Sequence, residues 1–219
     1  MPSPGPMIDR NPEGALIRKA RLYDALVGVL TFGRERRFRE AILDLAHLST
    51  GERVLDVGCG TGTLAIGVKR QVGETGVVHG VDASAGMIAL ASKKAEARGA
   101  AVDFQTAAAQ ALPFDDSSFD AVLCTMVMHH LPRDQRPQAV AEMGRVLRPG
   151  GRLLVVDLAQ EGGMAARLNP IALLHGKPAL DTTREAKELI DHGGFVDITT
   201  GKVPIRNLAF VLGRKPAAP

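Results

Sequence analysis

The sequence is poor in aromatic residues and has no long apolar segment. Of its 219 residues, none is Trp, one is Tyr and seven are Phe. Proteins that bind flipped or single-stranded bases use aromatic side chains for stacking, so this composition argues against a nucleic-acid partner. No stretch approaches the ~18 consecutive apolar residues of a transmembrane helix, so we expect no membrane span.

Cysteine and unbalanced charge are also scarce. The two cysteines, Cys59 and Cys124, lie in strand-like apolar sequence, which argues against a disulfide framework or a four-ligand zinc site. The net charge is +3, and the densest basic cluster, at 33–40, is interleaved with glutamate, as on a solvated helix face. The histidines lack a metal-ligand spacing, so no metal is predicted. The first residues lack the order of a signal peptide, which predicts a cytoplasmic protein.

Short β-branched or leucine-rich runs alternate with longer helical patterns. A strand followed by a helix, repeated, predicts a largely parallel sheet with helices on both faces. Ser84 is placed to cap one helix, and the Pro and Gly of 148–151 end another. The predicted strands are 53–57, 77–82, 102–107, 119–125 and 151–157, and the predicted helices are 63–72, 84–98 and 133–147.

The pattern changes after residue 157. Residues 158–181 are interrupted by Gly, Asn-Pro and Gly-Lys-Pro, which is typical of a lid or a substrate-side insertion. A helix at 182–193 then precedes two strand-like runs, 194–203 and 205–215, joined around Pro204. So short a link predicts a hairpin, and therefore an antiparallel strand in the sheet.

The stretch VLDVGCGTGTLA, residues 54–65, is the most informative in the chain. It places Gly58, Gly60 and Gly62 on alternate positions between a strand and a helix, with Cys59 and Thr61 between them. Glycine lets the backbone approach a ligand closely, and the start of a helix presents unpaired N–H groups. This turn therefore predicts a ligand site.

The following strand ends in Asp82, which would reach the same edge of the sheet and accept hydrogen bonds from ribose hydroxyls. A nucleoside-containing ligand is implied. The dinucleotide fingerprint has Gly or Ala at its sixth position, where this chain has Thr63, so NAD is the weaker interpretation.

Taken together, these motifs resemble the class I S-adenosylmethionine-dependent methyltransferases, in the branch of the ubiquinone/menaquinone-biosynthesis enzymes. The resemblance covers roughly residues 18–213 and rests on VLDVGCGTGTLA, GVDAS, AAAQALPFDDSSFDAVLCTMVMHHL and RVLRPGGRLLVVD. It implies a Rossmann-like, doubly wound α/β fold: a seven-stranded sheet, mostly parallel, with an antiparallel last strand. It also implies residues 1–35 as a flexible tail and cap helix, and 36–219 as the cofactor-binding domain with its lid at 158–181.

The resemblance further implies which residues bind S-adenosylmethionine. The glycines lie against its methionine part, Asp56 supports its ammonium group and Asp82 holds its ribose. Met87 resembles an apolar platform for adenine. The remaining implied contacts are the turn residues Cys59 and Thr61, Ala83 beside the adenine, Ala109 and Gln110 on its other side, backbone atoms of Cys124 and Thr125, and Tyr23 of an N-terminal helix that closes over the cofactor.

One position departs from the family pattern. Relatives commonly read GDAEALPF where residues 107–114 read AAAQALPF, so the acid that usually binds the adenine amino group is replaced by Ala108. Gln110 or a backbone carbonyl is the expected substitute.

Methyl transfer needs alignment and exclusion of water more than elaborate catalytic groups. His129 and His130 follow the fourth strand, and either could act as a base toward the acceptor or serve a structural role. Nucleic-acid amino methyltransferases carry Asn/Asp-Pro-Pro-aromatic at this place, where the chain has CTMVMHH. The sequence thus predicts an enzyme that methylates a small apolar or aromatic molecule such as a quinone-like precursor, with a homodimer as one option. A protein or RNA acceptor, and a non-catalytic cofactor-binding regulator, are the alternatives.

Overall fold

The computed structural model describes residues 35–159, 182–204 and 207–217. They form one seven-stranded sheet in the order β3-β2-β1-β4-β5-β7-β6. Helices are α2 (Glu35–Ala46), α3 (Thr63–Val72), α4 (Ala85–Ala97), α5 (Arg136–Val146) and α7 (Thr182–His192), with 3-10 turns η1 (Met128–His130) and η2 (Arg133–Gln135). Strands are β1 (Arg53–Val57), β2 (Val77–Asp82), β3 (Asp103–Thr106), β4 (Phe119–Thr125), β5 (Leu147–Leu158), β6 (Val196–Lys202) and β7 (Leu208–Arg214).

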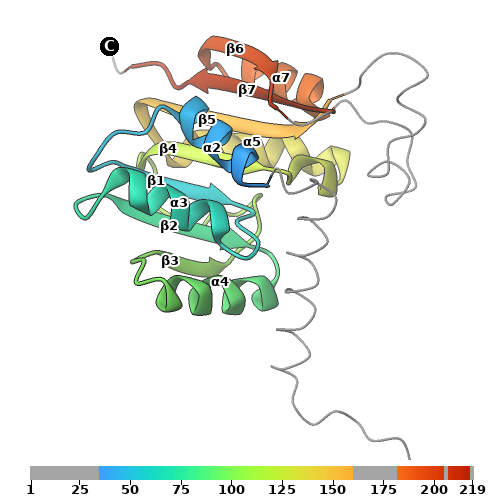
Figure 1. Cartoon of the computed structure of the whole chain (residues 1–219). Coiled ribbons are helices and arrows are strands. Elements are labelled where there is room, and N and C mark those ends of the chain that lie inside the picture. Colours follow the sequence, from blue (N-terminus) through green and yellow to red (C-terminus); the bar gives the residue numbers. More distant parts are fainter. Residues whose placement is uncertain (1–34, 160–181, 205–206, 218–219) are drawn as a thin grey trace, which may run out of the picture.

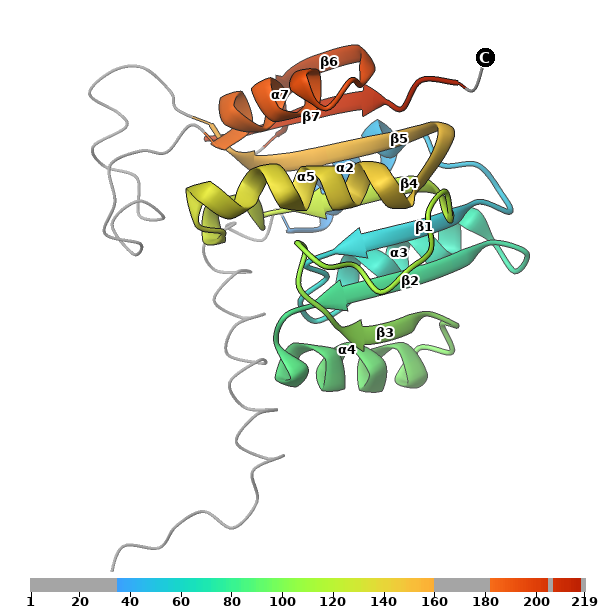
Figure 2. The ribbon, with the colours of Figure 1, turned by 180° about the vertical axis from the view of Figure 1, so that it is seen from behind.

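The sheet is doubly wound, as predicted. β1 to β5 run parallel, and β7 pairs antiparallel with both β5 and β6, which confirms the predicted hairpin and the antiparallel last strand. Helices α2 and α3 cover one face (Figure 1), and α5 covers the other, as the reverse view shows (Figure 2). Parallel strands must bury both faces, which explains their near-continuous apolar sequences.

Neighbouring residues of one strand serve two separate cores. Val54 packs with α2 and α3, in a cluster that includes Ile42 and Ala65, whereas Leu55 packs with α5 and α7, in a cluster that includes Met143 and Ile190. Successive side chains of a strand point to opposite faces, so a one-residue slip would exchange the two cores. This register fixes where each strand ends, and the carboxyl ends of β1, β2, β4 and β5 meet at one edge.

Two predicted boundaries differ from the structure. The helix expected over 133–147 is divided into η2 and α5, with Pro137 in the first turn of α5, where its missing N–H costs nothing. β5 begins at Leu147, four residues before the expected start, because Leu147 already pairs with Phe119 ahead of an irregularity in the ladder. Ser84 caps α4 as predicted, its hydroxyl accepting a hydrogen bond from the Met87 N–H at 3.4 Å.

Candidate functional site

The glycine turn joins the end of β1 to the start of α3 at the carboxyl edge of the sheet. Its first two residues are held by the neighbouring strand, because the N–H groups of Gly58 and Cys59 both donate to the carbonyl of Val81, at 2.7 and 2.9 Å. Gly62 N–H closes the turn by donating to the Cys59 carbonyl at 2.9 Å. The turn is therefore a fixed structure that does not depend on a ligand for its shape.

The glycines are required for different reasons. A Cβ at Gly58 would lie 2.1 Å from Val127 Cγ2, and one at Gly62 would lie 2.6 Å from Phe104 Cζ; both residues also have positive φ, 71° and 73°. A Cβ at Gly60 would meet nothing within 4 Å. Gly58 and Gly62 thus let the turn pack against the protein, whereas Gly60 faces open space, where a ligand could approach the backbone.

Asp82 ends β2 and binds this turn from the side. Its Oδ2 accepts from Gly60 N–H at 3.0 Å and its Oδ1 accepts from Ser84 N–H at 2.9 Å. A carboxylate has about four acceptor positions, so two remain for an external donor such as a pair of ribose hydroxyls. The sequence-predicted Asp82 therefore lies at this edge with acceptor positions left over, and its role toward a ribose stays a prediction.

Asp56 lies beneath the turn and is 2% exposed. Its Oδ2 is buried and has no hydrogen-bond partner. In the described part of the chain, the only other buried side-chain atom of this kind is the hydroxyl oxygen of Thr125, at the end of β4. Burial and the nearby charge of Asp82 raise the pKa of Asp56 to about 7. A hydrogen bond from the Ala65 N–H acts in the opposite direction and lowers this pKa in part. A buried acid with an unpartnered oxygen is costly alone, and a cationic group at this place would compensate that cost.

The residues expected around the adenine gather next to Asp82. Thr106 pairs with Asp82 across β2 and β3, and Ala107 N–H donates to the Asp82 carbonyl at 3.1 Å, so the following loop lies at this edge. In that loop Ala108 is exposed and Ala109 is buried, while across from it Ala83 is exposed and Met87 half-buried. The Gln110 amide nitrogen donates to the Gln135 side chain, which leaves the Gln110 carbonyl oxygen as its acceptor for another group.

His129 and His130 lie just beyond β4, with ring centroids 3.9 Å apart. The Nδ1 atom of His129 is 2.8 Å from Oδ1 of Asp157, a residue at the end of β5 that sequence reasoning did not single out. The two residues are 28 positions apart in the chain, and only the pairing of β4 with β5 brings them together.

Sequence reasoning also missed Lys94. Its ammonium group, on α4, donates to the hydroxyls of Thr61 and Thr63 at 2.7 and 2.8 Å, and so fixes the turn to the first residue of α3. The sequence offers no signal for this contact, since Lys94 occurs in an ordinary helical pattern. Thr61 itself is buried.

Both cysteines are free and buried thiols. Burial, followed by the charges of nearby carboxylates, raises the pKa of Cys59 and of Cys124, so neither is a thiolate or a nucleophile at neutral pH. The described residues contain no cluster of three potential metal ligands and no helix able to cross a membrane. Tyr23 lies outside the described residues, as do residues 160–181 of the expected lid.

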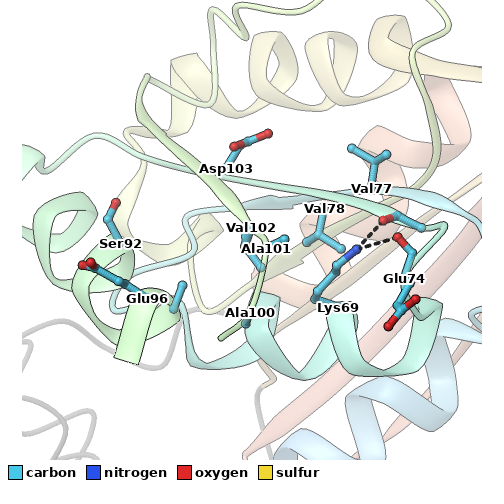
Figure 3. Close-up of a pocket in the computed structure, with 12 residues that line it drawn as sticks. Lys69, Glu74, Val77, Val78, Ser92, Glu96, Ala100, Ala101, Val102 and Asp103 are labelled. Carbon is cyan, nitrogen blue, oxygen red and sulfur yellow. Dashed lines mark hydrogen bonds between the residues drawn. The ribbon is translucent and has the colours of Figure 1, made fainter. Parts of the chain in front are cut away.

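The described residues form a hollow of about 500 Å³ at the opposite, amino edge of the sheet. It lies between α3, α4 and the first residues of β2 and β3 (Figure 3). The Lys69 ammonium group donates to the carbonyls of Gly73, Glu74 and Gly76 at 3.0, 3.2 and 2.6 Å, so all three of its donors serve the end of α3. None of the residues that line this hollow has a buried side-chain nitrogen or oxygen without a partner, so the hollow offers less for a ligand to satisfy.

Much of the chain is similar to known methyltransferases. Residues 54–151 match the family model described as a methyltransferase domain. The chain is 42% identical over 135 residues to demethylmenaquinone methyltransferase of Thermus thermophilus, which covers 62% of this chain and 60% of the relative. It is 37% identical over 139 residues to the ubiquinone/menaquinone biosynthesis C-methyltransferase UbiE of Geobacter sulfurreducens, covering 63% of this chain and 54% of the relative.

A solved structure shares the fold. The crystal structure of the cyclase SpnF superimposes with a TM-score of 0.68 at 24% identity, over 83% of this chain and 81% of that one. Matching regions thus span little more than half of the two curated relatives and most of the structural neighbour.

Proposed function

We propose that the protein, whose residues 54–151 match a methyltransferase domain, transfers a methyl group from S-adenosylmethionine to a small apolar or aromatic molecule. One observation carries the proposal. The open backbone at Gly60, the spare acceptor positions of Asp82 and the unpartnered oxygen of Asp56 lie together at the carboxyl edge, within the residues that match the family model.

These residues fit the cofactor chemically. Asp82 offers acceptors for the ribose hydroxyls, and Asp56 offers a negative charge for the ammonium group. Ala83, Met87 and Ala109 supply apolar surface on the two sides of an adenine, with Gln110 as its polar neighbour. The turn residues Gly58 to Gly62 and the ends of β4 at Cys124 and Thr125 would line the methionine part. NAD, by contrast, is disfavoured because Thr63 replaces the last glycine of its fingerprint.

When bound, S-adenosylmethionine supplies a methyl group already activated by its sulfonium. The chain's own task is to hold the acceptor in line with that group and to exclude water. As the acceptor atom bonds to carbon, the carbon–sulfur bond breaks and its electron pair stays on sulfur, which gives the methylated product and S-adenosylhomocysteine. A proton on the acceptor must leave, and we assign its removal to His129 or His130, which lie beyond the end of β4.

The acceptor class rests on the relatives. Both are named for menaquinone or ubiquinone biosynthesis, and we propose a quinone-like aromatic acceptor for this chain. We propose that residues 1–35 and 158–181 determine which acceptor is bound. The second segment begins at Leu158 and is followed by Thr182, and these two residues are hydrogen-bonded at the carboxyl edge. The free thiols favour a cytoplasmic location, and we propose action without a nucleic-acid partner.

Incubation with S-adenosylmethionine tritiated in its methyl group tests the proposal. The acceptors offered are reduced demethylmenaquinone, a whole-cell small-molecule extract, cellular protein and RNA. We expect label in the quinol or in the extract, and much less label when Asp82→Ala replaces the wild type at a cofactor concentration near the wild-type dissociation constant. Label found only in protein or RNA would show that the acceptor is a macromolecule and would overturn the proposed small-molecule acceptor. No transfer to any fraction by a protein that binds S-adenosylhomocysteine would indicate a non-catalytic regulator, and stabilisation by NADH alone would refute the cofactor.

A further inference from the structure

Among the acids that the structure describes at the carboxyl edge, Asp157 makes the most side-chain hydrogen bonds. It is fully buried at the end of β5. Oδ1 lies 2.8 Å from His129 Nδ1 and accepts from Leu158 N–H at 2.7 Å and from the Thr182 hydroxyl at 2.9 Å, while Oδ2 faces the His129 N–H at 3.4 Å. Three elements, η1, β5 and α7, therefore meet on one side chain.

The charge state of Asp157 determines the direction of its bond to His129. Burial by itself would raise the pKa of Asp157, but hydrogen bonds from His129, Leu158 and Thr182, with the nearby imidazole, outweigh burial and lower it. The carboxyl group is thus ionised at neutral pH, and an ionised carboxylate only accepts. Nδ1 of His129 must then be the donor.

A ring that is neutral carries one proton, so a proton on Nδ1 leaves the lone pair on Nε2. The side chain of His129 is 5% exposed and its ring packs against His130. The ring therefore cannot readily turn over, which would bring Nε2 to Asp157 and leave Nδ1 to face the methyl acceptor. The backbone of Asp157 is also held in place, because the Thr183 hydroxyl donates to the Asp157 carbonyl at 3.0 Å.

From this geometry we infer that Asp157 is a positioning residue that holds His129 in the Nδ1–H tautomer and makes Nε2 its proton-accepting atom. The inference deepens the proposed function and rests on it for its catalytic meaning. In the assigned step, the acceptor's proton passes to His129 Nε2, and the resulting imidazolium is stabilised by the Asp157 charge. Thr182 ties the same carboxylate to the start of α7.

Long-range nitrogen–proton NMR of protein labelled with ¹⁵N-histidine tests the inference without any substrate. His129→Gln identifies the His129 signals among the six histidines. At a pH where the ring is neutral by its own nitrogen shifts, we expect a protonated Nδ1 and an unprotonated Nε2 in the wild type. The reverse pattern would overturn the inference, and this measurement does not depend on the folding of any substituted position at Asp157.

Three variants separate positioning from mere support. Asp157→Ala removes the acceptor and should give a mixture of tautomers. Asp157→Asn should keep the Nδ1–H tautomer, because its amide oxygen can occupy the Oδ1 position, but should lower turnover at least about tenfold through loss of charge. Thr182→Val, the matched control, removes another partner of Oδ1 and should lower the melting temperature while leaving the tautomer unchanged.

An Asp157→Ala protein with wild-type nitrogen shifts would refute the role of Asp157. Should that variant not fold, the wild-type tautomer and the Asp157→Asn and Thr182→Val spectra still decide the matter. Binding of S-adenosylhomocysteine is measured on the same samples. A wild type that fails to bind it would overturn the proposed function while leaving the tautomer result standing, so the two failures can be told apart.

Discussion

The two edges of the sheet differ in how their polar groups are satisfied. At the amino edge there is a hollow of about 500 Å³, yet the Lys69 ammonium group inside it spends its three donors on backbone carbonyls. At the carboxyl edge, Asp56 keeps a buried oxygen without a partner and Gly60 faces open space. Folding alone explains the first arrangement, whereas the second carries a cost that a ligand would offset. Unsatisfied groups therefore favour the carboxyl edge as the ligand site, although the hollow lies at the other edge.

The largest expected effect comes from adding one methyl group at each edge. Gly58→Ala would place a Cβ 2.1 Å from Val127 at a positive φ, and Gly76→Ala would place one 2.3 Å from Val72 at the amino edge. Both should destabilise the fold by about 1–3 kcal/mol through overpacking, and Gly58→Ala by about 1 kcal/mol more through backbone strain. Only Gly58→Ala should abolish S-adenosylhomocysteine binding.

Thermal unfolding and titration calorimetry check this pair. If Gly76→Ala weakened binding as much as Gly58→Ala, while both variants remained folded, the division between the two edges would be wrong.

The second comparison removes one carboxylate at each edge of the sheet, one from the end of β2 and one from the start of β3. Asp82→Ala deletes a charged acceptor that we expect to bind the ribose, at about 1.5–3 kcal/mol, or roughly ten- to hundredfold in dissociation constant. Asp103→Ala removes an acid that begins β3 and has an 83% exposed side chain, so binding should not change. Calorimetric dissociation constants for S-adenosylhomocysteine are the measurement. An unchanged constant in folded Asp82→Ala would remove this residue from the site.

The third prediction concerns stability and pH at Asp56. The pKa of Asp56 in the folded protein is about 7, well above the ordinary value of an aspartate, so its ionisation disfavours folding increasingly as pH rises from about 4 to 7. Asp56→Asn removes that ionisation. The melting temperature of the variant relative to wild type should therefore be higher at pH 8 than at pH 5, while S-adenosylhomocysteine binds about tenfold more weakly without the charge.

Unfolding curves from pH 5 to pH 8 test the sign. A melting-temperature difference that stays constant with pH would show that Asp56 does not titrate as its burial implies. Lys69→Met is a suitable control at the amino edge: it should lower stability at every pH and leave binding unchanged.

The sequence was sufficient for those features that depend on local pattern. Three alternate glycines after an apolar strand require a tight turn, and the acid at the end of the next strand must reach the same edge, so Gly60 and Asp82 could be placed without coordinates. The topology followed from the order of strands and helices for the same reason.

Contacts between distant residues could not be found this way. His129 meets Asp157 only because Thr125 pairs with Val156 at the end of β4 and β5, and no local pattern encodes that register. Lys94 reaches Thr61 across 33 positions through the packing of α4 beside α3. Pro137 illustrates a third limit, since either a continued helix or a new one beginning there fits its chemistry.

The smallest expected effect concerns the missing acid at Ala108, which is exposed beside Asp82. Ala108→Asp should restore a charge-assisted hydrogen bond to the adenine amino group and tighten S-adenosylhomocysteine binding by about 1 kcal/mol, or roughly fivefold. Ala101→Asp adds the same charge in the amino-edge hollow and should leave S-adenosylhomocysteine binding unchanged.

Gln110 provides an alternative partner for the adenine amino group. Its amide nitrogen donates to Gln135, so its carbonyl oxygen could already accept from the same amino group. In that case the new carboxylate would be desolvated without a free donor, and affinity would stay level or fall. Dissociation constants for Ala108→Asp, Gln110→Ala and the double variant separate the two cases, because residues that share one donor are coupled and independent ones are additive. Additive effects, with no loss in Gln110→Ala, would exclude Gln110 as the substitute and leave a backbone carbonyl in that role.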